Sequence, residues 1–217
     1  MSKEKSPPLD KLSLLCKDSN IPICDKEVRV SFTYTVFLKN TLVCFIGDSQ
    51  SGKSRLMMEL EKRSDFLIRI VRSTTTRHRR ENETEYVYRK FYRHASKDFF
   101  QKSIAAGHFV EYDEYAGNLY GTSHNALEHT LSISHAMLAV TEKTVPHLQS
   151  LGLNVVSIQI IGVNAPGSDD PLRQKADAER RGSITPDYVI FNDFAPGGFE
   201  KACAELLHII KPYIAEI

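Results

Sequence analysis

The stretch IGDSQSGKS, residues 46–54, has the residue types and the spacing of a loop that binds phosphate groups. It fits the pattern G-x-x-x-x-G-K-[ST], in which glycines allow close approach and backbone N–H groups face one anion. The lysine of this pattern reaches the β- and γ-phosphates, and its serine hydroxyl contacts Mg²⁺. The sequence therefore predicts a P-loop for a nucleoside triphosphate, with Ser54 as the metal contact. The phosphate-binding residues are expected to be Gly47, Asp48, Ser49, Gln50, Ser51, Gly52, Lys53 and Ser54.

The segments on either side of the P-loop are of the kinds needed to position it. LVCFI before the loop predicts a buried parallel strand, and RLMMELEKR after it predicts an amphipathic helix. Apolar strand-like runs and helical segments then alternate to the end of the chain, which predicts an α/β fold. FLIRIVRSTTTR is expected to be a strand that runs into a Ser/Thr-rich turn, and SKDFFQKSIAAG a helix capped by Ser96 and ended by Gly107. The expected architecture is a parallel sheet covered by helices on both faces, with ligands at the carboxyl ends of the strands. Residues 1–27 are expected to be a flexible extension, and 28–217 one domain that starts with a strand at 28–38.

The composition of the chain excludes several classes of protein. It has 217 residues, of which 41% are hydrophobic and 25% charged, with a formal net charge of +1. No apolar run is long enough for a membrane span, and no overall field favours nucleic acid. The four cysteines show no metal-ligand spacing, and the amino-terminal residues contain no apolar signal core. These features predict a cytoplasmic protein with no membrane span and no nucleic-acid partner.

A second group of polar residues follows between positions 73 and 122. Arginine forks match phosphate oxygens two at a time, and tyrosine hydroxyls add neutral donors. A carboxylate such as Glu111 can accept from a ring N–H and an exocyclic amine together, the edge that guanine presents. Taken alone, RHRR at 77–80 is more typical of a solvated charge run or a nuclear-import signal than of a phosphate site. The members of this group are Ser73, Arg77, Arg80, Glu83, Tyr86, Glu111, Tyr120 and Thr122.

The same blocks resemble a known family. STTTRHRRENETEY is similar to the guanylate kinase pattern S-x-T-T-R-x-x-R-x-x-E…D-Y, and FVEYDEYAGNLYGTS resembles F-(I/L)-E-x-x-x-(F/Y)-x-G-N-x-Y-G-(S/T)-S. The resemblance implies a GMP-binding lobe at 73–122, a mobile lid segment at 165–185, and phosphoryl transfer from Mg-ATP to GMP. It assigns the GMP phosphate to Ser73, Arg77, Arg80, Tyr86 and Tyr120, with Glu83 beside them, and guanine to Glu111 and Thr122. It assigns catalysis to Lys53, Arg77, Arg80 and Arg173.

Three departures from the family pattern concern the catalytic groups. Where the family carries D-x-D at the end of a strand, this chain has Ala139 and Thr141, which supply no carboxylate. Glu142 is expected to face the other side of that strand. The lid segment has room for about one helix instead of two, so the assignment of Arg173 depends on a spacing one residue short. Arg180 and Arg181 replace a lid arginine only if this segment folds differently.

The third departure is the shortened approach to the lobe tyrosine, which leaves Tyr86 and Tyr88 as alternatives. Two functions therefore remain open at this point. One is an active nucleoside monophosphate kinase, slow if the lost groups are not replaced. The other is a catalytically weak guanylate kinase-like scaffold domain that binds nucleotide or a phosphorylated protein partner. Retention of Lys53 favours the first alternative, and the GNLYGTS block disfavours any other small-molecule kinase.

Overall fold

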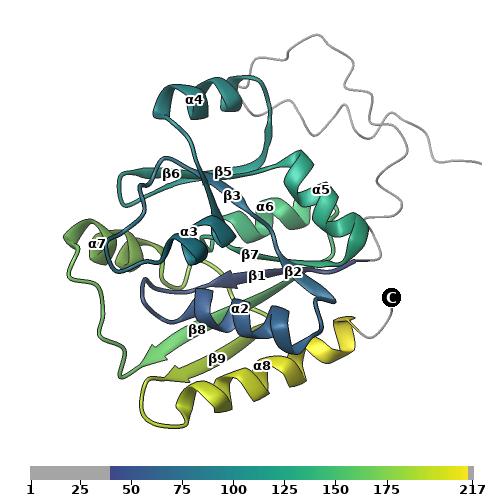
Figure 1. The fold of residues 1–217 in the computed structure, drawn as a ribbon, viewed down its shortest axis with the longest axis vertical. Helices are drawn as coiled ribbons and strands as arrows, with labels where there is room; N and C mark the ends of the chain where they lie inside the picture. Colours follow the sequence, from purple (N-terminus) through teal and green to yellow (C-terminus); the bar gives the residue numbers. More distant parts are fainter. Residues whose placement is uncertain (1–39, 215–217) are drawn as a thin grey trace, which may run out of the picture. The chain divides into compact units, whose positions relative to one another are not determined.

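A parallel sheet of five strands forms the centre of the computed structural model, which describes residues 40–214 (Figure 1). The strand order is β2-β7-β1-β8-β9, and every neighbouring pair is parallel. The strands are β1 (Leu42–Ile46), β2 (Ile68–Ile70), β7 (His135–Ala139), β8 (Val155–Val163) and β9 (Tyr188–Asp193). β1 is completely buried between β7 and β8, so its carboxyl end delivers the P-loop to the middle of the sheet edge.

Helices cover both faces of this sheet, as the alternating pattern predicts. On one face, α2 (Lys53–Arg63) and α8 (Gly198–Ile214) enclose a core that includes Val43 and Phe45. On the other face, α5 (His124–Ile133) and α6 (Thr144–Ser150) enclose a core that includes Leu42 and Cys44. Successive residues of β1 therefore point into opposite cores, which explains why the whole strand is apolar.

A second, mixed sheet of four strands builds the lobe. Its order is β4-β3-β6-β5, with β3 and β4 parallel and the other pairs antiparallel. The elements are β3 (Ser73–Thr75), α3 (Glu85–Phe91), β4 (Tyr92–His94), α4 (Lys97–Ala105), β5 (Phe109–Tyr115) and β6 (Asn118–Ser123). α4 starts where the sequence predicts, because the Ser96 hydroxyl accepts from the Phe99 N–H and caps the helix.

Two expectations about the lobe are wrong. FLIRIVRSTTTR was expected to be one strand followed by a turn, but the chain crosses here from β2 in the first sheet to β3 in the second. The short helix α3 was not expected, and it separates Glu83 from the next strand.

The lid segment contains a single helix, α7 (Pro171–Arg180), between β8 and β9. The Asp170 carboxylate accepts from the Leu172 N–H, and Pro171 follows it at the first helical position, where proline is well tolerated. The expected extension at 1–27 and the expected strand at 28–38 lie outside the described residues. Within residues 40–214, no helix is both long enough and apolar enough to cross a membrane.

Candidate active site

The P-loop connects β1 to α2, and its two glycines are required by their surroundings. Gly47 has a φ of 131°, and a Cβ at this position would lie 2.3 Å from the carbonyl oxygen of Ile160 on β8. Gly52 has a φ of 91°, and its Cβ would lie 2.2 Å from Nδ2 of Asn192 on β9. The same Nδ2 donates to the carbonyl of Ser51 at 2.9 Å. Two neighbouring strands therefore support the loop, and they leave no space for a side chain at either glycine.

Lys53 lies at the start of α2, and its ammonium group is turned onto the loop. Nζ donates to the carbonyl oxygens of Gly47 and Asp48, both at 2.6 Å, and to the Ser51 hydroxyl at 3.3 Å. Burial lowers the pKa of Lys53 to about 8, against the opposing effect of the carboxylates of Asp177 and Asp48. At neutral pH the side chain remains mostly protonated, as a group that neutralises phosphate charge must be.

The lobe contributes a cluster of positive charge. The Arg77 guanidinium is buried and makes two hydrogen bonds to the Glu83 carboxylate, at 2.9 and 3.2 Å. Burial is the largest single effect and lowers the pKa of Arg77, but the hydrogen bond to Glu83 and the charges of Tyr92, Glu83 and Tyr120 together outweigh it, and the pKa is raised. Burial, followed by the charges of Arg77 and Arg173, lowers the pKa of Arg80. Three guanidinium groups from the lobe and α7 therefore lie near one another, an arrangement that an anion would stabilise.

Two arginine side chains, one from the lobe and one from α7, each have a donor atom without a protein partner. Within residues 40–214, Arg77 Nε and Arg180 Nη1 are buried nitrogen atoms without a hydrogen-bond partner. An unpaired buried donor is unfavourable, so each of these positions suits a ligand acceptor.

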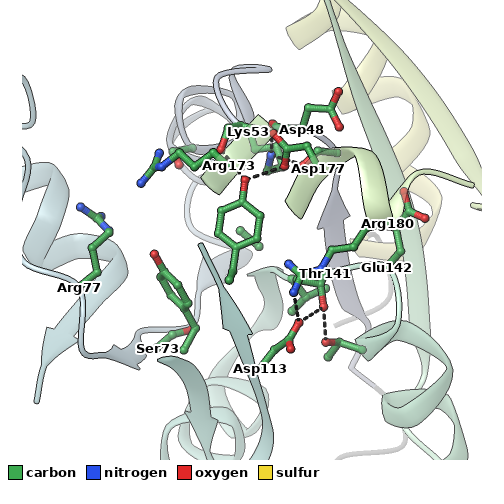
Figure 2. Close-up of a pocket in the computed structure, with 18 of the residues that line it drawn as sticks. Asp48, Lys53, Ser73, Arg77, Asp113, Thr141, Glu142, Arg173, Asp177 and Arg180 are labelled. Atoms are coloured by element: carbon green, nitrogen blue, oxygen red, sulfur yellow. Dashed lines mark hydrogen bonds and ion pairs between the residues drawn. The ribbon is translucent and has the colours of Figure 1, made fainter. Parts of the chain in front are cut away.

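Two carboxylates, Glu111 and Asp113, lie two residues apart on β5 and line the same cavity. Burial raises the pKa of Glu111 to about 7, although hydrogen bonds from Thr122 act in the opposite direction. Asp113 Oδ2 accepts from the Thr141 hydroxyl at 2.7 Å (Figure 2), while Oδ1 pairs with the Lys143 ammonium. Thr141 stands where the family pattern has a carboxylate, and its hydroxyl forms a hydrogen bond with the carboxylate of Asp113 on β5.

One cavity of about 210 Å³ joins these parts. The P-loop, the lobe and the lid segment all line it, and Figure 2 shows Lys53 and Arg77 in its walls. The predicted site residues that line it are Gly47, Asp48, Ser49, Gln50, Lys53, Ser54, Ser73, Arg77, Arg80, Glu83, Glu111, Tyr120 and Arg173.

Comparisons with known proteins agree with this geometry. The family model described as guanylate kinase matches residues 39–211. The chain belongs to the guanylate kinase family. A guanylate kinase of Vibrio vulnificus is 31% identical over 189 residues, which cover 80% of this chain and 88% of that protein. A guanylate kinase of Homo sapiens is 29% identical over 190 residues, with 79% and 93% covered. The crystal structure of guanylate kinase from Anaplasma phagocytophilum superimposes with a TM-score of 0.56 at 26% identity, with 81% and 86% covered.

Four predicted residues of this guanylate kinase family member do not line the cavity. The Tyr86 side chain is 71% exposed, because α3 turns it to solvent, so its assignment to the phosphate is wrong. Thr122 is fully buried behind the cavity, where its hydroxyl pairs with that of Ser73 at 3.2 Å. The Ser51 hydroxyl accepts a hydrogen bond from Lys53, and its carbonyl accepts one from Asn192 on β9. Gly52 is the N-cap residue of α2.

Tyr92 is a cavity residue that the sequence analysis missed. It pairs in register with Ser73 across β3 and β4, and its ring is 5.9 Å from that of Tyr120 in an edge-on arrangement. The Arg77 guanidinium lies over it, 5.0 Å from the ring centroid. Because α3 lies between Glu83 and β4, the lobe tyrosine follows Glu83 later than expected. The sequence feature that could have identified Tyr92 is its position four residues before the helix cap Ser96.

Asp113 was also missed, and the expected orientation of Glu142 is wrong. β7 ends at Ala139, so the alternation of a strand no longer applies three residues later. Glu142 lines the cavity, and its carboxylate accepts from both the N–H and the hydroxyl of Ser183, at 2.9 and 2.8 Å. It anchors the chain that follows α7 and is not a free acidic group.

The site offers few protein ligands for a metal ion. Among the described residues, no group of three or more His, Cys, Asp or Glu side chains has the geometry of a metal site. Ser54 lines the cavity next to Lys53, and Ala139 supplies no ligand. This set fits Mg²⁺, which commonly binds through nucleotide phosphates, water and one or two protein oxygens.

Proposed function

We propose that this protein transfers the γ-phosphoryl group of ATP to GMP and releases ADP and GDP. One observation carries the proposal: a single cavity has the P-loop with Lys53 in one wall and Arg77 and Arg80 of the lobe in another. Direct transfer between two nucleotides requires their phosphates to meet in one water-poor space, and two separate anion sites would not serve. The free thiols of Cys44 and Cys203 fit the cytoplasmic location that we propose with it.

The chain's own residues would act by positioning and by charge neutralisation. The P-loop amides and Lys53 would hold the β- and γ-phosphates of ATP, and Ser54 would contact Mg²⁺ when the ion arrives with the nucleotide. The GMP phosphate would be held by guanidinium and hydroxyl donors. These are Ser73, Arg77, Arg80, Tyr92 and Tyr120, all of which line the cavity. No covalent protein intermediate is needed, because phosphoryl transfer depends on alignment and electrostatics.

The two carboxylates on β5 supply a basis for selecting guanine. The guanine edge carries a ring N–H and an exocyclic amine, which are neighbouring donors, whereas adenine has an acceptor in place of the ring N–H. Glu111 and Asp113 present buried carboxylate oxygens on the same face of β5. A site built for two donors rejects a base that leaves a buried acceptor unpaired. Asp113 thereby compensates for the carboxylate that is absent at Thr141.

A coupled assay of ADP release with GMP and Mg-ATP tests the proposed reaction. We expect turnover that depends on GMP and that falls about a hundredfold or more in Lys53→Ala, because this variant loses the cation at the transferred group. Arg89→Ala is the matched control, since the Arg89 side chain is exposed on α3 and pairs with Glu85 away from the cavity. Equal activity in Lys53→Ala and the wild type would contradict the assignment of the P-loop.

A second candidate function is binding of a phosphorylated protein without turnover. The observation that favours it is Ala139, which leaves the cavity one carboxylate poorer than in the family pattern, while Arg77 and Arg80 remain. In the assay above, this candidate predicts no GMP-dependent ADP release. It also predicts binding of a phosphopeptide that is lost in Arg77→Ala and kept in Lys53→Ala.

A further inference from the structure

Asp177 on the lid helix α7 makes direct contact with the P-loop. Its Oδ2 accepts from the backbone N–H of Ser49 at 2.9 Å, and its Oδ1 accepts from the Tyr115 hydroxyl at 2.6 Å (Figure 2). The Ser49 and Tyr115 hydroxyls are themselves 2.6 Å apart. Asp177 is only 9% exposed. A carboxylate from the lid, a hydroxyl from the lobe and an amide from the P-loop therefore meet at one buried point.

The amide that Asp177 occupies belongs to the anion-binding surface of the loop. Ser49 is the third residue of the G-x-x-x-x-G-K-[ST] pattern, whose N–H groups turn toward a phosphate chain. The carboxylate also lies near enough to Lys53 for its charge to favour the protonated lysine. Asp177 thus offers the P-loop a negatively charged oxygen, which is what a phosphate would offer.

Two arginines at the end of α7 hold the helix in this position. Arg181 makes hydrogen bonds to both carboxylate oxygens of Asp48, with Nε at 3.0 and 3.2 Å. The Arg180 side chain donates to the carbonyl of Glu114 and lies 3.2 Å from the Asp113 carboxylate. The contact of Arg181 attaches the end of α7 to the P-loop, and the contacts of Arg180 attach it to the lobe. Together they hold the Asp177 carboxylate against the Ser49 amide.

We propose that Asp177 is an internal competitor of the nucleotide polyphosphate, so that ATP must displace it from the P-loop. The Ser49 N–H is a single donor and serves either the carboxylate or a phosphate oxygen. A second anion placed beside Asp177 in this buried space is also repelled by it. ATP entry therefore requires α7 to withdraw its carboxylate, and the lid segment limits the affinity of the P-loop. This inference rests on the proposed binding of ATP at the P-loop.

Titration calorimetry with an imido analogue of ATP, in the presence of Mg²⁺, measures this competition without any turnover. Asp177→Ala removes the carboxylate, and we expect it to bind the analogue roughly tenfold more tightly than the wild type, as expected for one charge-assisted hydrogen bond. Asp177→Asn keeps the shape and loses the charge, so a smaller gain is expected. Glu179→Ala is the matched control, because it removes an exposed carboxylate from the same helix, 3.8 Å from Lys175 and outside the cavity. Its affinity should equal that of the wild type.

The outcomes separate this inference from the proposed function. Binding by the wild type with equal or weaker binding by Asp177→Ala would overturn the inference alone, and weaker binding would make Asp177 a contact that closes the lid. No binding by the wild type, by Asp177→Ala and by Asp177→Asn would overturn the nucleotide site itself. Tyr115→Phe provides a second variant if Asp177→Ala does not fold. It removes the hydroxyl that donates to Oδ1, and an affinity between those of the wild type and Asp177→Ala is expected, whereas no gain would count against the competition.

Discussion

The two halves of the cavity are held together by different kinds of contact. The P-loop is fixed by the close approach of its backbone to β8 and β9, at Gly47 and Gly52. The lobe and the lid segment are fixed by side-chain charges, such as Arg77 to Glu83 and Arg181 to Asp48. Backbone packing against a buried sheet is rigid, whereas charged side chains exchange partners readily. The half that we propose holds the polyphosphate is therefore preformed, and the half that we propose binds GMP is able to rearrange.

The charged contacts also differ among themselves in strength. The Arg77–Glu83 pair is buried, with side-chain exposures of 6% and 14%, and it preserves the shape of the lobe. The Arg181–Asp48 pair is open to solvent, at 64% and 40%, and such pairs contribute about 0–1 kcal/mol and weaken with salt. Of the contacts that hold the lid segment, this exposed pair is the one that salt weakens, whereas Asp177 and Arg180 make more buried contacts with the P-loop and the lobe.

The largest expected effect comes from breaking the rigid half. Gly47→Ala should reduce nucleotide affinity about a hundredfold or more, because its Cβ would meet the Ile160 carbonyl and push the loop away from β8. Calorimetry with the ATP analogue measures the loss. Gly197→Ala is the control, since Gly197 has a φ of 82° but no atom near its Cβ position. If both variants lose stability but keep nucleotide affinity, the loop is not held as described.

In the adaptable half, Arg80→Ala should raise the KM for GMP about thirtyfold or more and leave the KM for ATP little changed. The variant loses a guanidinium in the cavity, and hydrogen bonds to charged groups are worth about 1.5–3 kcal/mol. Arg79→Ala is the matched control, because Arg79 is the neighbouring residue and is absent from the cavity lining. Equal effects of the two substitutions on the KM for GMP would mean that the overall positive charge of the lobe, and not the position of Arg80 in the cavity, determines GMP binding.

The pH dependence of GMP binding should follow Glu111. Its folded pKa of about 7 lies above the ordinary value of 4.5, so the carboxylate is mostly charged at pH 8 and mostly neutral at pH 6. Because only the charged form accepts from both donors of guanine, the KM for GMP should rise about tenfold from pH 8 to pH 6. Steady-state kinetics at fixed ionic strength measures this change. In Glu111→Gln this tenfold change in the KM for GMP should disappear, and the shallower titration of the GMP phosphate should remain. If the pH dependence of the KM is the same in this variant as in the wild type, Glu111 does not bind guanine.

The smallest expected effect distinguishes two tyrosines. Tyr92→Phe should raise the KM for GMP about fivefold, since it removes one neutral hydrogen-bond donor from the lobe. Tyr86→Phe should have no effect, because the Tyr86 side chain points to solvent on α3. The reverse result would restore the assignment made from the sequence.

The sequence was informative where one local rule determines the structure. Residues 46–54 are a contiguous pattern, and Ser96 and Gly107 mark the ends of a helix whose cap and left-handed turn both form as expected. The P-loop and the order of strands and helices follow from such rules, whereas the lobe residues of the cavity lining were assigned by the family resemblance.

The sequence was less informative where residues distant in the chain meet. Nothing local to Asp113 indicates that it accepts a hydrogen bond from Thr141, which is separated from β5 by two strands and a helix. The lobe tyrosine was misplaced because α3 is a short helix with little apolar periodicity, and it lies between Glu83 and β4. Asp177 was not singled out, because only the docking of α7 turns a charged surface helix toward the P-loop.

The contact between Asn192 and the P-loop has a consequence for synthesis of the chain. The loop residues lie in the first quarter of the sequence, but the amide that supports them is carried by the last strand. A nascent chain that has not yet reached β9 contains every residue of the motif and lacks half of its scaffold. We therefore expect the ability to bind a nucleotide to emerge only after β9 has been synthesised and has paired with β8.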